Sequence, residues 1–175
     1  MIKTIIALSL LGALLSCDKD PLSNKRVKDV PGETIKEYTH SYSGTMMWYI
    51  TWYKIEKGDD GNLRLLYSKD CEPEITIYKC PADALKKIDG FVRQYKLWNL
   101  KNSYQPKMEV LDGYSWHTSI TYEDAWLSTG GCNAWPPKEL SDGLSAIDGY
   151  VKSIIDATTD ADIIGTDNHN DRRER

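Results

Sequence analysis

Alternation of apolar and polar residues predicts six β-strands in this chain. The strongest pattern lies in residues 46–56, MMWYITWYKIE, a segment that is apolar on both faces of the strand. A turn rich in Gly and Asp follows at 58–61 and predicts a hairpin with the next strand. The predicted strands are 35–43, 46–56, 62–68, 74–79, 114–122 and 125–129.

Two other segments repeat apolar residues at helical spacing. Pro81 precedes the first predicted helix, and the apolar stripe of that helix includes Leu85 and Val92. The second begins after a pair of prolines at 136–137 and keeps its stripe as far as Ile154. Because each helix buries one stripe, we expect an α+β fold. Its antiparallel sheet has about six strands, in the order β-β-β-β-α-β-β-α, with both helices packed on one face.

The first 17 residues have the pattern of a secretory signal peptide. Lys3 precedes an apolar run at 5–15, which is too short to span a membrane as a helix. The run ends in LLSC, which resembles the bacterial lipobox and implies that Cys17 carries acyl chains, palmitate among them. The following DKD resembles the surface-export signal of Bacteroides-type lipoproteins. These resemblances imply a bacterial lipoprotein on the outer membrane, with the periplasmic or surface face left open.

The rest of the chain divides by composition into three parts. Residues 18–33 are polar with two prolines and one glycine, and predict a tether between the membrane and a domain. Residues 34–157 hold all the predicted strands and helices and form a single α+β domain. Residues 158–175 are rich in Asp and Thr and end in DNHNDRRER, which predicts a disordered tail.

The aromatic composition favours a binding surface. The chain has eleven Tyr and six Trp but one Phe, and its net charge of -4 gives no basic footprint for nucleic acid. Residues 46–56 are apolar on both faces of the strand, but two helices can cover only one face of a sheet. The other face is either covered by the N-terminal segment and long loops or open, so that it displays Trp48 and Trp52, or Tyr49 and Tyr53.

Cysteine spacing restricts the disulfides that the chain can form. With Cys17 lipidated, three cysteines remain, and two of them, Cys71 and Cys80, bracket the strand at 74–79, which holds them too far apart to bond. Cys80 and Cys132 each precede a helix start and are the candidate pair. No CxxC motif and no paired His occur, so no metal site is expected.

Residues 111–140 concentrate Trp, Gly and turn-forming residues. Asp112 and Asn133 have the chemistry to cap turns through their side chains. Trp116 and Trp135 either join the core or line a pocket at this corner. The sequence LDG, then Trp116, then GCNAWP at 131–136 resembles a family of uncharacterised bacterial proteins with the signature DGxxW…GxNAxP. The resemblance covers about residues 81–156 and implies a fold but no activity.

Three functions remain open on the sequence. The first is a non-enzymatic binding module, for a glycan, a peptide or an envelope protein, and the candidate ligand-binding residues are Trp48, Trp52, Tyr49, Tyr53, Trp116 and Trp135. The second is a small hydrolase that uses His117 with a nearby carboxylate, although no nucleophile motif, phosphate loop or cofactor motif is present. The third is an inhibitor or immunity-type protein with a protein partner.

Overall fold

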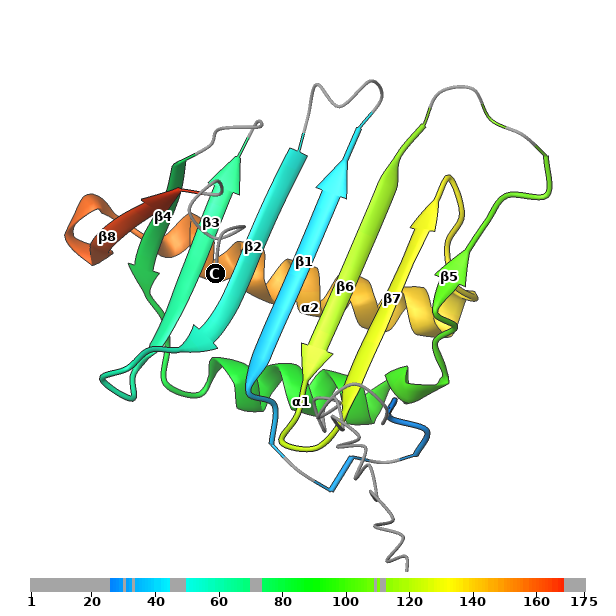
Figure 1. Cartoon of the computed structure of the whole chain (residues 1–175), viewed down its shortest axis with the longest axis horizontal. Helices are drawn as coiled ribbons and strands as arrows, with labels where there is room; N and C mark the ends of the chain where they lie inside the picture. The colour runs from blue at the N-terminus through cyan, green and yellow to red at the C-terminus, as the bar shows by residue number, and fades with distance from the viewer. Residues whose placement is uncertain are drawn as a thin grey trace, which may run out of the picture.

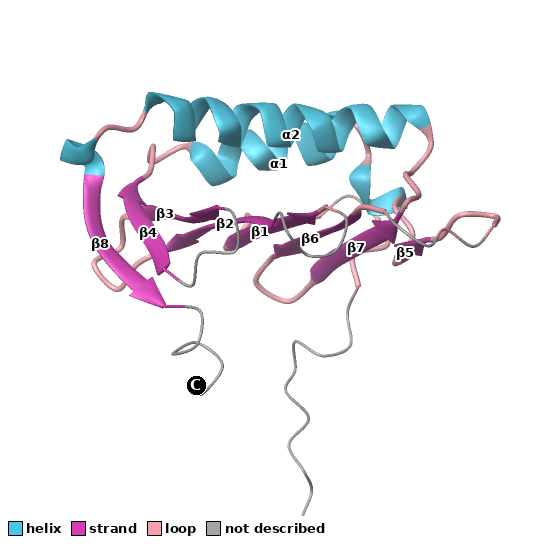
Figure 2. Ribbon diagram, turned by 90° about the horizontal axis from the view of Figure 1, so that it is seen from above, coloured by secondary structure: helices cyan, strands magenta, loops and turns pink. Residues whose placement is uncertain are grey.

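The computed structural model describes residues 26–29, 31–32, 34–44, 50–69, 74–108, 110 and 113–168. It is an α+β structure in which two helices cover one face of an eight-stranded sheet (Figures 1 and 2). The strands are β1 Glu37–Ser43, β2 Ile50–Lys57, β3 Leu63–Lys69, β4 Glu74–Lys79, β5 Ser103–Tyr104, β6 Ser115–Thr121, β7 Trp126–Cys132 and β8 Ile163–Asn168. The helices are α1 Ala84–Gln94 and α2 Lys138–Ala157, with short 3₁₀ turns at Leu97–Asn99 and Asp160–Asp162.

The predicted α+β fold is confirmed, but the sheet has two more strands than expected. Its order is β5-β7-β6-β1-β2-β3-β4-β8. The six predicted strands all form and pair antiparallel with one another. The extra strands lie at the two edges, and β5 pairs parallel with β7. The prediction of a purely antiparallel sheet of about six strands is therefore wrong at its edges.

The prediction that residues 158–175 are a disordered tail is wrong for residues 163–168. Residues 163–168 form β8, which pairs antiparallel with β4 along most of its length. The pairing satisfies backbone groups of β4 that would otherwise be exposed at the sheet edge. Only residues 169–175 of the predicted tail lie outside the described part of the chain.

The predicted tether also belongs partly to the domain. Val27 is buried in the core, and its backbone N–H donates to the carbonyl of Trp126 over 2.9 Å. The guanidinium of Arg26 donates to the backbone carbonyls of Leu100 and Ser128. Residues 26 and 27 are therefore docked on the domain at the Trp126 end of β7.

The main core lies between the helices and the sheet, as the apolar stripes predict. Fully buried residues of the sheet, such as Ile55 and Leu65, belong to one cluster with Ile88 of α1 and Ile147 of α2. α1 and α2 pack against each other as well as against the sheet. Gly143 allows α2 to approach the end of α1 closely, because a Cβ there would lie 2.5 Å from Cβ of Tyr95.

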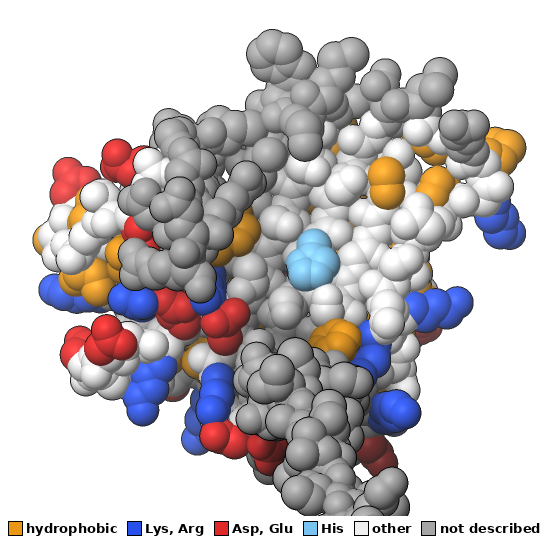
Figure 3. All heavy atoms as spheres, viewed as in Figure 1, with side chains coloured by type: hydrophobic (Ala, Val, Ile, Leu, Met, Phe, Trp, Pro, Cys, Tyr) orange, Lys and Arg blue, Asp and Glu red, His pale blue; other side chains and the backbone are white. Residues whose placement is uncertain are grey.

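The opposite face of the sheet is mostly polar where β1, β6 and β7 form it. Alternation places Ser41, His117, Ser119 and Ser128 on this face. Figure 3 shows this side of the molecule, where hydrophobic atoms form separate small groups. These three strands do not form an open aromatic surface. In the segment 46–56, for which such a face was predicted, Trp52 lies on this side and is half-buried, and residues 46–49 lie outside the described residues. Most of the described aromatic side chains of the sheet lie on the helix side.

Candidate functional site

A groove of about 560 Å³ lies between α2 and the helix-covered face of the sheet. We call it the aromatic groove. Strands β1, β2, β3 and β6 supply one wall and α2 supplies the other, which can be followed in Figure 1 where α2 passes behind these strands. The residues that line it are His40, Tyr42, Thr51, Tyr53, Tyr67, Lys69, Trp116, Trp135, Ser141, Leu144, Ser145, Asp148, Lys152, Ile155 and Asp156.

A stacked pair of tryptophans forms one end of the aromatic groove. The rings of Trp116 and Trp135 are nearly parallel, with centroids 5.4 Å apart and planes 3° apart. Trp116 is only 4% exposed, and its Nε1 donates to the carbonyl of Ala134 over 2.9 Å. Trp135 is 54% exposed. One indole is thus fixed in the core and holds the second as an exposed aromatic platform.

The corner at 131–134 fixes this tryptophan pair. Gly131 is required because a Cβ there would lie 2.3 Å from the carbonyl oxygen of Ala134 and 2.7 Å from Nε1 of Trp116. Asn133 has a positive φ of 48°, and its Oδ1 accepts a hydrogen bond from the backbone N–H of Tyr114 over 2.8 Å. The prediction that Asn133 caps this corner is confirmed. The Gly, Asn and Trp positions of the signature therefore have a shared structural role.

Hydrogen bonds organise the polar side chains in the middle of the aromatic groove. The hydroxyl of Tyr53 donates to Oδ1 of Asp148 over 2.7 Å and so ties β2 to α2. The ring of His40 stacks on Tyr53 with centroids 5.2 Å apart, and its Nδ1 lies 2.8 Å from Oγ1 of Thr118. Burial lowers the pKa of His40 to about 4, against the opposing field of Asp148. His40 is therefore neutral at pH 7.

The charges that line the aromatic groove are balanced. Asp148 and Asp156 come from α2, Lys152 comes from the same helix, and Lys69 comes from β3. Nζ of Lys152 lies 3.5 Å from Oδ1 of Asp156 in an exposed pair, which contributes little to stability. With two acidic and two basic side chains and a neutral His40, the groove does not select for strongly charged ligands.

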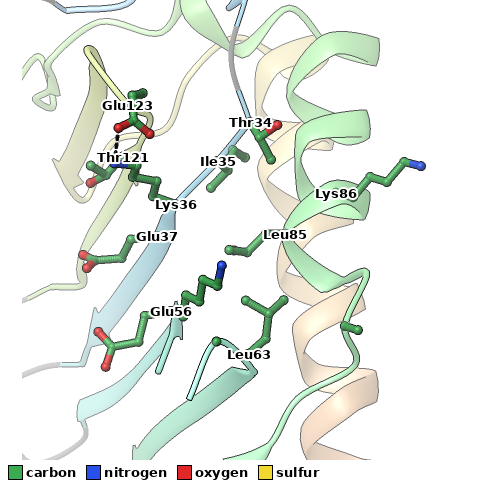
Figure 4. A pocket seen from close by; sticks show the side chains of 13 residues that line it. Thr34, Ile35, Lys36, Glu37, Glu56, Leu63, Leu85, Lys86, Thr121 and Glu123 are labelled. Carbon is green, nitrogen blue, oxygen red and sulfur yellow. Dashed lines mark ion pairs between the residues drawn. The ribbon is translucent and has the colours of Figure 1, made fainter. Parts of the chain in front are cut away.

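A second pocket, of about 900 Å³, lies at the other end of the strands near the start of α1. Figure 4 shows that Ile35, Leu63 and Leu85 point into this space, whereas the carboxylates of Glu37 and Glu56 point away. Several of its polar side chains are also engaged by neighbouring charges. Lys54 lies 2.7 Å from Glu37 and 2.5 Å from Glu56.

These ion pairs change the pKa of Glu56. Although its burial opposes the effect, hydrogen bonds from Lys54 and Arg64 lower the pKa of Glu56. Its polar groups are thus satisfied within the protein and are not directed at a ligand. We therefore regard the smaller aromatic groove as the better candidate site, because its aromatic and polar groups converge on one space.

The structure divides the six predicted ligand-binding residues into three groups. Tyr53, Trp116 and Trp135 come together in the aromatic groove. Trp52 lies on the opposite face of β2 and is half-buried. Trp48 and Tyr49 lie outside the described residues, as do Cys17, Cys71 and Asp112.

The predicted disulfide between Cys80 and Cys132 is wrong. Both cysteines are free thiols. Cys132 ends β7 and Cys80 follows β4, and these strands are five places apart in the sheet order. At about 4.8 Å per strand this is a separation of about 24 Å, far beyond the reach of a disulfide.

His117 does not have the surroundings that the hydrolase hypothesis needs. Its Nε2 lies 2.9 Å from Oγ of Ser128 on the polar face of the sheet. In the described part of the chain, no carboxylate is hydrogen-bonded or ion-paired with its ring. Neither His117 nor Ser128 lines the aromatic groove or the larger pocket. Partial burial lowers the pKa of His117 and so favours the uncharged form of its ring.

Sequence reasoning missed the residues that α2 contributes. Ser145, Asp148 and Lys152 are polar residues outside the apolar stripe of the predicted helix, a position that is usually exposed to solvent. Tyr42 and His40 share the face of β1 that carries the buried Tyr38, and this alternation was the available signal. The sequence pattern does not show that Tyr53 of β2 contacts Asp148 of α2, because these two residues are 95 positions apart.

The comparisons add no family to this description. The chain matches no protein-family model, and no curated protein matches it in sequence. The resemblance of residues 81–156 to the DGxxW…GxNAxP proteins therefore stays a prediction.

Two further features are absent from the described residues. Among them, no three His, Cys, Asp or Glu side chains gather in a way that could hold a metal ion. In the same part of the chain, no helix has the length and apolar character needed to cross a membrane.

Proposed function

We propose that this chain is a lipid-anchored protein of the bacterial envelope that binds a ligand in the aromatic groove and does not act as an enzyme. The observation that carries the proposal is the convergence of Tyr53, Trp116 and Trp135 with polar side chains of α2 on one space of about 560 Å³. Binding sites for small ligands are commonly of this size and combine apolar walls with a few placed polar groups.

The position of the aromatic groove supports this proposal. Glu37 begins β1 and Tyr42 lies near its other end. Glu37 pairs with Thr121 of β6, and Thr121 pairs with Trp126, the residue to which Arg26 is bridged. Glu37 and Tyr42 are five residue steps apart along the strand, which is about 17 Å. The groove thus opens at the end of the sheet that lies away from the docked N-terminal segment.

The proposed lipid anchor limits how far the domain reaches from the membrane. Nine positions separate Cys17 from Arg26, so the connecting chain spans at most about 32 Å when fully extended. The domain would lie near the membrane, on either the surface or the periplasmic face of the outer membrane. Metabolic labelling with palmitate tests the anchor. The wild-type chain should take up label and Cys17→Ala should not; equal labelling of both would refute it.

Photo-crosslinking in cells tests the groove as a binding site. A photoreactive amino acid replaces Ser145, which lines the groove, and in a control protein it replaces Gly90, which is exposed on α1 with open space around it. We expect an adduct from position 145 in the full-length protein and none from position 90. Absence of any adduct at 145, with normal expression and folding, would refute a binding function for the groove.

A further inference from the structure

We infer that the ligand of the aromatic groove is a neutral glycan. This inference rests on the proposed binding function and adds the chemical class of the ligand. Three features of the groove lead to it: two chemically different walls, balanced charge, and a sheet wall without free backbone groups.

The two walls offer complementary contacts. Of the aromatic rings on the sheet side, Tyr53 and Trp116 are buried. Tyr42 is half-buried and Trp135, which stacks on Trp116, is 54% exposed, so these two rings face the groove. The faces of such rings are electron-rich and attract the polarised C–H groups on the flat side of a sugar ring. The exposed Trp135 is already held by Trp116, so little conformational freedom is lost when a ring stacks on it.

The helix side carries hydrogen-bonding groups in one row. Ser141, Ser145, Asp148 and Lys152 line the groove at spacings of four, three and four residues. These spacings place them on one face of a helix, and eleven residues span about 16 Å along its axis. The row presents hydroxyl, carboxylate and ammonium groups, which together accept from and donate to sugar hydroxyls. It is long enough for more than one sugar ring.

The electrostatics favour a neutral ligand. Asp148 and Asp156 balance Lys69 and Lys152, and burial keeps His40 neutral at pH 7. Polyanions and polycations are bound by surfaces with an excess of one charge. The aromatic groove has no such excess.

The sheet wall disfavours an extended peptide. Strands that bind a peptide by β-addition need a free edge. The strands β1, β2, β3 and β6 that form this wall are all internal, with a paired neighbour on both sides. Their backbone N–H and C=O groups are used within the sheet, so recognition must come from side chains, as in glycan binding.

Calorimetric titration of the full-length protein tests the inference. The protein is kept in a detergent without a sugar headgroup and titrated with cellohexaose, maltohexaose and hexa-N-acetylchitohexaose. We expect at least one of these neutral hexasaccharides to bind. Trp135→Ala should then raise the Kd at least about tenfold, and Ser145→Trp, which fills the groove, should abolish binding.

Trp52→Ala is the matched control, because Trp52 lies on the opposite face of the sheet. Its Kd should equal that of the wild type, and circular dichroism should show that all variants are folded. Binding of none of the three hexasaccharides would overturn the inference. So would binding that Trp52→Ala weakens and Trp135→Ala does not.

The two tests fail in different ways. If position 145 crosslinks to a protein and no hexasaccharide binds, the glycan assignment is wrong while the groove remains a binding site. If position 145 gives no adduct and no hexasaccharide binds, both the assignment and the proposed function are wrong.

Discussion

Replacement of Gly143 by alanine tests the close contact between α2 and the segment that follows α1. A Cβ at this position would lie 2.5 Å from Cβ of Tyr95 and 2.8 Å from Cδ2 of Leu97. Leu97 is fully buried, and Lys96 between these two residues has a positive φ of 53°, so the segment has little freedom to move aside. We expect α2 to shift away from its contact.

The magnitude follows from two opposing effects. Overpacking of a tight interface destabilises a protein by about 1–3 kcal/mol, and the atoms closest to position 143 place this case near the upper value. Alanine in a helix interior is favoured over glycine by about 1 kcal/mol. Gly143→Ala should therefore lower the free energy of unfolding by about 2 kcal/mol.

Gly149 provides the matched control on the same helix. It is exposed, and a Cβ there would have nothing within 4 Å, so only the helix propensity changes. Gly149→Ala should raise the free energy of unfolding by about 1 kcal/mol, which leaves the two variants about 3 kcal/mol apart.

Urea unfolding followed by tryptophan fluorescence measures these differences, with free energies obtained by linear extrapolation. A Gly143→Ala variant as stable as the wild type would refute the packing argument. Because Ser141, Leu144 and Ser145 line the aromatic groove, the same substitution should also weaken ligand binding, and Gly149→Ala should not.

Three further predictions concern titration, reactivity and a buried hydrogen bond. Burial lowers the pKa of His40 to about 4, whereas an unfolded His titrates near 6.5. The unfolded chain therefore binds a proton that the folded one does not, and stability should fall by up to about 3 kcal/mol as the pH drops from 6.5 through 4. His40→Gln should lose this part of the pH dependence in urea titrations, and an unchanged slope would contradict it. Iodoacetamide at pH 8 should modify Cys132 in the folded protein long before Cys80, since burial raises the pKa of Cys80 to about 12; peptide mass spectrometry that found Cys80 modified first would oppose this. Tyr53→Phe removes the 2.7 Å hydrogen bond to Asp148 and should lower stability by about 1–2 kcal/mol, whereas a neutral result in urea unfolding would count against the bond.

Local periodicity was sufficient to predict the strands and helices that have one regular apolar face. β4 forms at the predicted residues 74–79, and α2 begins directly after the predicted prolines. The helical stripe of α2 coincides with the face turned to the core, and the alternation of β4 separates Ile75 and Ile77 from Tyr78, which packs against the core. The prediction that Trp52 and Tyr53 face opposite sides is confirmed for the same reason.

The edge strands could not be predicted because distant partners create them. β5 is two residues long and exists through its pairing with Gly130 and Gly131. β8 contains Gly, Asp and Asn, which are unfavourable in strands, and it forms by pairing with β4. The aromatic groove has the same origin, since it requires Tyr53 and Asp148 to meet across the domain. Its aromatic half was accessible from the pattern, and its helical half was not.

β8 has a consequence for the solubility of the protein. It covers β4 along one long edge of the sheet, while the other edge ends in the short β5. A chain that stops at Ala157 would leave the five β4 residues that pair with β8 without a partner on that edge, and bare edges recruit strands from other molecules. Such a shortened protein should self-associate and aggregate during expression. β8 thus protects the sheet edge from association with other molecules, although its own sequence has little strand propensity.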